Sequence, residues 1–190
     1  MKNVFKKRLL ATSMALLLTG CGTIESEEET SLESQEQSLA ACENTTELAE
    51  AAEHSCTHAE LGPFQNVTAA ALGTIPFVDV SVPHTAYVVT LPAASCGGYG
   101  GSVIFTPEES TEYAFLTSRS RGLRIFDGNT EVTRECRYEV PQDVCGSLRA
   151  ATIADLEAGK DYRLEFKAIR QTNAQFTLVI EETAHHDHEE

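Results

Sequence analysis

The chain has 190 residues, enough for one ordinary domain with extensions, and its formal net charge at pH 7 is −15. A composition of 42% hydrophobic and 23% charged residues is typical of a folded protein and excludes collagen-like, fully disordered and multi-span membrane chains. The acidic balance also argues against a nucleic-acid-binding protein, which needs a basic face to displace counterions from phosphates.

Residues 1–20 have the pattern of a cleaved bacterial signal peptide. Four basic side chains precede an apolar run, 9–18, that is shorter than the roughly 20 residues needed to cross a bilayer. The run ends in Leu18-Thr19-Gly20-Cys21, which resembles the lipobox of bacterial lipoproteins. The resemblance implies that Cys21 is lipidated and, because Gly22 rather than Asp follows it, that the protein is sorted to the outer membrane.

Residues 21–41 are predicted to be the lipidated cysteine followed by a disordered acidic linker. This stretch is rich in Glu, Ser, Thr and Gln, so it cannot bury enough surface to offset its ordering entropy. Its six glutamates repel one another and favour an extended chain. Residues 42–63 form a short segment with cysteines and histidines, in which we expect one or two helical turns capped by Thr45 or Thr46.

Residues 64–182 are predicted to form the main domain. Apolar and polar side chains alternate clearly around Leu164 and Leu178, so each of those strands should bury one face. Short strands at regular spacing predict an all-β fold, an antiparallel Greek-key β-sandwich of about seven to nine strands preceded by the disordered acidic tether. Turns are expected at Gly97-Gly98 and Asp127-Gly128-Asn129. The expected strands are 77–82, 86–91, 102–106, 112–117, 123–126, 137–140, 162–168 and 175–180.

The segment Leu156-Glu157-Ala158-Gly159-Lys160-Asp161-Tyr162 resembles the tyrosine corner of Greek-key sandwiches. In such corners the tyrosine hydroxyl hydrogen-bonds to the backbone a few residues upstream. With the Asp-Gly turn before it and the Phe-Thr-Leu-Val-Ile strand after it, residues from about 103 to 181 are similar to the pre-peptidase C-terminal-type sandwiches of secreted bacterial proteins. That resemblance implies a non-catalytic accessory module.

Six cysteines leave five once Cys21 is lipidated, and an exported chain meets an oxidising compartment in which disulfides persist. Cys136 and Cys145 flank a short polar stretch, and we expect them to pair and staple a loop or hairpin end. Cys42, Cys56 and Cys96 then provide one further pair and one free thiol. The sequence does not choose among the three pairings, and the remaining thiol is a candidate metal ligand.

Two histidine clusters are the candidate metal site. His54 and His58 share a face if their segment is helical, whereas on a strand they would share a face with Cys56 and Glu60. Neutral imidazole is a usual ligand of zinc and copper. His84 stands alone after Pro83, and we expect it to have a structural role.

The second cluster lies in the His- and acid-rich tail, 183–190, a composition typical of metal-binding tracts. Segments before the first strand and after the last strand of a sandwich can lie close together. We therefore expect a zinc or copper site made from both clusters, and a solvated tail that binds metal weakly is the alternative. The expected metal ligands are His54, His58, His185, His186, Asp187 and His188.

The sequence contains no His-Glu-x-x-His motif, nucleophile elbow or phosphate-binding loop, so we expect neither an enzyme nor an organic cofactor. The predicted function is capture, buffering or delivery of zinc or copper by a lipid-anchored protein of the cell envelope. It would lie on the periplasmic or surface face of the outer membrane, with the membrane and an envelope protein or transporter as partners. A non-catalytic module that binds a protein or glycan is the alternative.

Overall fold

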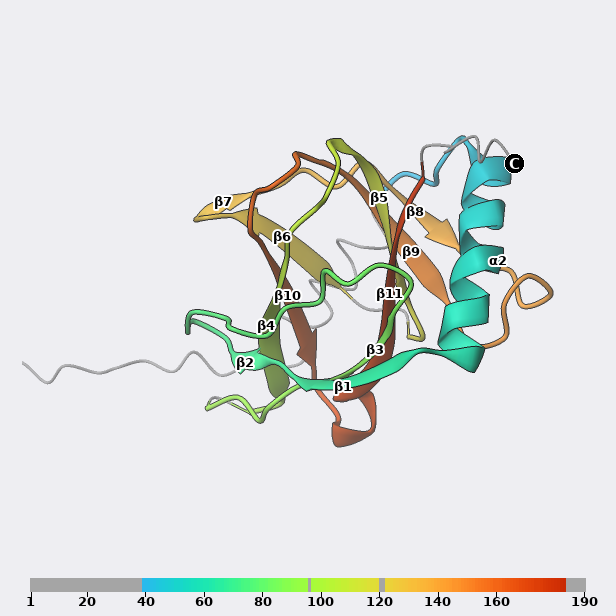
Figure 1. Ribbon diagram of the computed structural model, residues 1–190. Coiled ribbons are helices and arrows are strands. Elements are labelled where there is room, and N and C mark those ends of the chain that lie inside the picture. The colour runs from blue at the N-terminus through green and yellow to red at the C-terminus, as the bar shows by residue number, and fades with distance from the viewer. Residues whose placement is uncertain (1–38, 96, 120–121, 184–190) are drawn as a thin grey trace, which may run out of the picture.

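Two β-sheets packed face to face form the body of the protein in the computed structural model, which describes residues 39–95, 97–119 and 122–183 (Figure 1). Across the first sheet the order is β1 (Phe64–Thr68), β3 (Ala86–Thr90), β11 (Gln175–Glu182), β5 (Thr111–Thr117), β9 (Ala150–Leu156) and β8 (Cys136–Glu139). Across the second it is β2 (Ala70–Ala71), β4 (Tyr99–Phe105), β10 (Tyr162–Ala168), β6 (Leu123–Asp127) and β7 (Thr130–Glu131). A short 3₁₀ turn, η1 (Gln171–Asn173), precedes β11.

The predicted all-β sandwich is confirmed, with eleven strands in the part of the chain that the structure describes. All strand pairs are antiparallel except β1 with β3, which is parallel. The chain passes from the first sheet to the second at Ala69, between β1 and β2, so the two sheets are joined along one edge. Both predicted turns are present, with positive φ at Gly97, Gly98 and Gly128.

The strand predictions need two kinds of correction. The stretch 77–82 is not a strand, since its backbone pairs with the sheet only through the isolated bridge from Asp79 to Ile104. Its flanks are Pro76 and Pro83, and the Phe77 side chain is 81% exposed. Conversely, four strands were not expected, namely β1, β2, β7 and β9. Of these, β9 is rich in alanine and has little of the β-branched and aromatic character typical of strands.

The main core lies between the two sheets. Alternate residues of β10 point into it, as the sequence pattern predicted, and β11 contributes Phe176 and Leu178. The Phe166 and Phe176 rings pack with their centroids 4.9 Å apart. Burying an aliphatic or aromatic side chain of this size is worth about 1.5–3 kcal/mol, so this core is the main source of stability.

Three tyrosines anchor corners of the sandwich in the same way. The Glu157 N–H donates to the Tyr162 hydroxyl at 3.0 Å, so the tyrosine corner expected from the sequence is confirmed. The Val82 N–H donates to the Tyr87 hydroxyl at 2.9 Å. The Tyr113 hydroxyl lies 3.2 Å from its acceptor, the Glu109 carbonyl.

Helix α2 (Thr45–Leu61) covers the outer face of the first sheet and makes a third layer (Figure 1). It is longer than the one or two turns expected. Its Leu48 and Ala52 pack over Ala114 and Ala151, small side chains that let the helix approach the sheet closely. The predicted caps were wrong, since the residue before the helix is Asn44, whose side-chain amide donates to the Glu47 carboxylate. No helix of the described residues has the length and apolar character needed to span a membrane.

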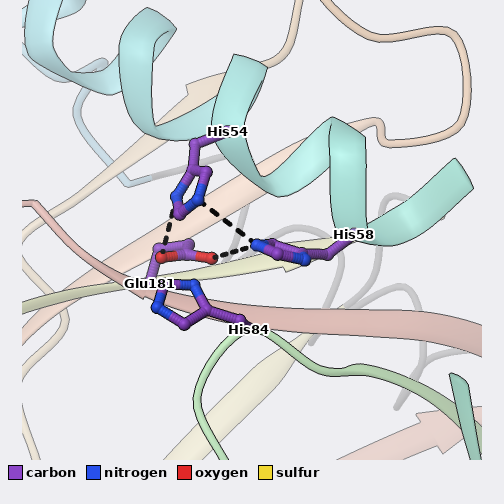
Figure 2. Close-up of side chains that lie close together, drawn as sticks. All are labelled: His54, His58, His84 and Glu181. Atoms are coloured by element: carbon purple, nitrogen blue, oxygen red, sulfur yellow. Dashed lines mark hydrogen bonds and ion pairs between the residues drawn. The ribbon is translucent and has the colours of Figure 1, made fainter. Parts of the chain in front are cut away.

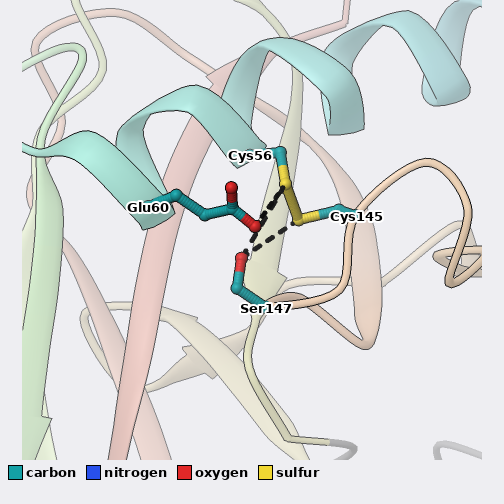
Figure 3. The surroundings of a disulfide bond; sticks show 4 residues. All are labelled: Cys56, Glu60, Cys145 and Ser147. Atoms are coloured by element: carbon teal, nitrogen blue, oxygen red, sulfur yellow. Dashed lines mark hydrogen bonds between the residues drawn. A yellow bond between two sulfur atoms is a disulfide. The ribbon is translucent and has the colours of Figure 1, made fainter.

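Two disulfides fasten α2 to the sandwich, and they replace the pairing expected from the sequence. Cys136 and Cys145 do not pair with each other: Cys42 bonds to Cys136, and Cys56 bonds to Cys145 (Figure 3). The expected hairpin staple is therefore wrong, because each of these cysteines faces the helix segment rather than the other. Among the described residues no cysteine is free.

Several predicted segments fall outside the described residues, namely the signal peptide, Cys21, most of the acidic linker, Cys96 and residues 184–190. The linker was expected to end at residue 41, and its last residues run beside β8. The Arg137 N–H donates to the Ala40 carbonyl at 3.0 Å. The described part of the chain thus begins at residue 39, within the predicted linker.

Candidate metal centre

Four side chains from three separate segments converge on the outer face of the first sheet. They are His54 and His58 from α2, His84 from the segment before β3, and Glu181 from β11 (Figure 2). One potential ligand atom from each residue lies within 4.8 Å of those of the others.

The helix places the first two ligands. His54 and His58 are four residues apart on α2, so their side chains lie on one face, one turn apart. Their Nε2 atoms are 3.3 Å apart. The helix ends at Leu61, and the next residue, Gly62, has φ of 82° and donates its N–H to the His58 carbonyl at 2.9 Å.

The strand supplies the carboxylate. Phe176, Leu178 and Ile180 of β11 pack against the inner core, so Glu181 projects to the opposite face, beneath α2. Its side chain is only 10% exposed. A glutamate in this position needs polar or cationic neighbours, because burying an unpaired charge is costly.

His84 comes from the neighbouring strand segment. The β3–β11 register pairs Tyr87 with Leu178, and extending it by three residues places His84 opposite Glu181. His84 has φ of 55°, the left-handed conformation that non-glycine residues seldom adopt. Residues held in such conformations cluster at functional sites.

The electrostatics of the site are dominated by the buried carboxylate. Burial raises the pKa of Glu181 from 4.5 to about 7, and the nearby His84 acts in the opposite direction. Its Oε2 lies 3.4 Å from Nδ1 of His54. Its Oε1 is buried, accepts no hydrogen bond, and lies 4.0 Å from Nε2 of His58.

Burial also acts on the histidines. Desolvation lowers the pKa of His58, and the adjacent His54 and His84 lower it further, whereas its contact with the Gly62 carbonyl acts against them. The three imidazole rings have centroid separations of 4.8–5.1 Å. Repulsion from His54 and His84 favours the neutral form of His58, which is the form that binds a metal.

This donor set fits a transition metal ion. Tetrahedral zinc with bonds of 2.0–2.1 Å requires donor atoms about 3.3 Å apart, which matches the separation of the His54 and His58 Nε2 atoms. The wider separations call for side-chain movements of about an ångström. A cavity of about 510 Å³ opens beside the cluster, and its walls include His54, His84 and Glu181.

The structure unites part of the predicted site and adds to it. His54 and His58 lie together as expected, whereas His185, His186, Asp187 and His188 lie outside the described residues. His84 and Glu181 were not expected as ligands, because their proximity depends on the pairing of two strands far apart in sequence.

Two other groups of potential ligands are present. Cys56, which would have joined His54 on a strand, lies on a helix and is committed to a disulfide, so its sulfur is removed from the ligand set. Glu112, Glu135 and Asp155 form a carboxylate group in which the hydrogen bond with Asp155 is the main cause that raises the pKa of Glu135 to about 7.

The chain matches no protein-family model and no curated protein.

Proposed function

We propose that the protein binds a transition metal ion, zinc or copper, through His54, His58, His84 and Glu181. The observation that carries the proposal is the buried Oε1 of Glu181, which accepts no hydrogen bond although three imidazoles surround the carboxylate. A carboxylate oxygen left in this state is costly, and a bound dication would offset the cost. Three imidazoles and one carboxylate are a donor set suited to zinc and copper(II).

The cellular role in the proposal is capture, buffering or delivery of the ion at the cell envelope. Two disulfides are consistent with an oxidising compartment outside the cytoplasm. The lipobox-like segment at Cys21 would anchor the protein to the outer membrane, and an envelope transporter would receive the ion. In this proposal His185, His186 and His188 of the tail collect ions weakly and pass them to the site at Glu181.

Calorimetry tests the proposal on the mature chain with Cys21→Ser, exported into an oxidising compartment without any added tag. Zinc and copper are titrated at neutral pH. We expect one ion per chain with a submicromolar dissociation constant. His54→Ala with His58→Ala should remove this binding, whereas Glu53→Ala with Thr57→Ala, at exposed positions of the same helix, should leave it intact.

A chain that ends at Thr183 distinguishes metal binding by the tail from metal binding at the cluster around Glu181. We expect this truncated chain to keep the single tight site and to lose only the weaker binding of metal by the tail. Equal affinities for the double histidine variant and its control would overturn the assignment of the site to α2.

A further inference from the structure

We infer that the cavity beside the cluster is the route by which the ion arrives, and that its glutamates admit free or cationic metal species and repel anionic chelates. This inference rests on the proposed metal site and names the class of ion complex that the site accepts. The cavity is far larger than a bare ion requires, and three of the four ligand residues form part of its wall. A metal in the site would therefore be reached from this side.

The charge of the cavity has one sign. Besides Glu181, its lining residues include five glutamates and, within the described part of the chain, neither lysine nor arginine. Clefts lined with charges of one sign focus the electric field and raise the rate of association with oppositely charged ligands. The five are Glu47, Glu50, Glu108, Glu109 and Glu182.

These glutamates line the same cavity as three of the ligand residues. Glu47 and Glu50 precede His54 on α2 by seven and four residues, which places all three along one side of the helix. Glu108 and Glu109 line the cavity from the loop between β4 and β5. At the inner end lies the Oε1 of Glu181, buried and without a hydrogen bond, which independently indicates that a cation belongs there.

Rapid-mixing kinetics test the inference on the same mature chain. The probe is hydrated Co²⁺ at low ionic strength, followed by its absorption on binding. Glu50→Gln with Glu108→Gln should lower the association rate constant about threefold to tenfold and leave the dissociation rate constant within about twofold. The difference should vanish near 1 M salt, where the screening length is about 3 Å.

The matched control is Glu43→Gln with Glu53→Gln, which removes the same charge from exposed positions that do not line the cavity. We expect this control to bind Co²⁺ with an association rate constant close to that of the wild type. A second readout offers the metal as its citrate complex, which should associate more slowly with the wild type and regain rate in Glu50→Gln with Glu108→Gln.

The outcomes separate this inference from the metal site itself. Equal association rates for the two double variants, with tight binding retained, would overturn the route and leave the site intact. A wild-type chain that binds no ion would overturn both.

Discussion

The Nδ1 atom of His54 lies 3.4 Å from Oε2 of Glu181, and this contact joins the helix that precedes the sandwich to the strand that closes it. The two residues are brought together by the packing of α2 on the outer face of the first sheet. Any change that shifts the helix therefore changes the site.

The unusual backbone of His84 predicts opposite effects on affinity and stability. In His84→Asn we expect zinc affinity to fall at least about tenfold, since one ligand of four is lost. Asparagine tolerates a φ of 55° well, so the free energy of unfolding without metal should be unchanged or slightly higher. Calorimetry and thermal unfolding in a chelator measure the two quantities, and wild-type affinity in this variant would remove His84 from the site.

The buried carboxylate predicts a pH dependence of stability in the metal-free protein. The pKa of Glu181 is about 7 in the folded chain and 4.5 ordinarily, so its stabilising contribution is complete below pH 4.5 and is lost as the pH rises through 7. The loss should be about 3 kcal/mol over that interval. His54, His58 and His84 face the same group.

In Glu181→Gln this part of the pH dependence should disappear. Denaturant unfolding from pH 4 to pH 8 with a chelator present measures it for both chains. A variant whose stability falls with pH as steeply as that of the wild type would show that another group is responsible.

The two disulfides predict different effects on metal affinity. They close loops of similar length, with sequence separations of 94 and 89 residues, so removing either should lower the free energy of unfolding by about 2–5 kcal/mol. Cys56 lies between the two helix ligands, whereas Cys42 precedes the helix. Replacing Cys56 and Cys145 by alanine should therefore weaken zinc binding about tenfold, and replacing Cys42 and Cys136 should weaken it less. The same loss of affinity in both pairs would contradict a local role of Cys56.

The tyrosine corner predicts a loss of stability without a change at the site. Tyr162→Phe removes the hydroxyl that accepts the Glu157 N–H, and should lower the free energy of unfolding by about 1–3 kcal/mol. Tyr99→Phe, at a half-buried position in β4, is the control and should have a smaller effect. If the two variants unfold at the same denaturant concentration, the corner hydrogen bond contributes little.

Close packing at β4 predicts that replacing Gly101 lowers the free energy of unfolding. An added Cβ would lie 2.7 Å from the Ala69 Cβ and 2.9 Å from the Ala70 carbonyl oxygen, where the chain crosses between sheets. Gly101→Ala should cost about 1–3 kcal/mol, and Gly146→Ala, where the Cβ would meet open space, should be nearly neutral. Thermal unfolding of the two variants measures the difference. Wild-type stability in Gly101→Ala would show that the chain near Ala69 can move to make room for the added methyl group.

Local patterns were enough for most of the fold. The alternation around Leu164 and Leu178 and the corner at Tyr162 follow from residues close together in sequence, and each was predicted correctly. The stretch 77–82 was wrong, because apolar content alone does not show that a segment bounded by prolines runs alongside the sheet instead of joining it. Strand β9 was missed because it is rich in alanine, which has low β propensity, although Ala151 packs beneath α2 and Ala154 in the core between the sheets.

The site could be predicted only in part. The spacing of His54 and His58 is a local signal, and it was enough to select them. Glu181 and His84 become neighbours through the β3–β11 pairing, and Cys56 and Cys145 through the docking of the helix. These are contacts between distant parts of the chain, and no pattern within one segment encodes them.

The pairing of the cysteines has a consequence for biosynthesis. A chain made from its N-terminus presents Cys42 and Cys56 to each other long before Cys136 and Cys145 emerge, and in the folded protein the first two do not pair with each other. A bond formed early between neighbours must later be exchanged by thiolate attack. Reaching the final pairing from such a bond requires disulfide exchange as well as an oxidant.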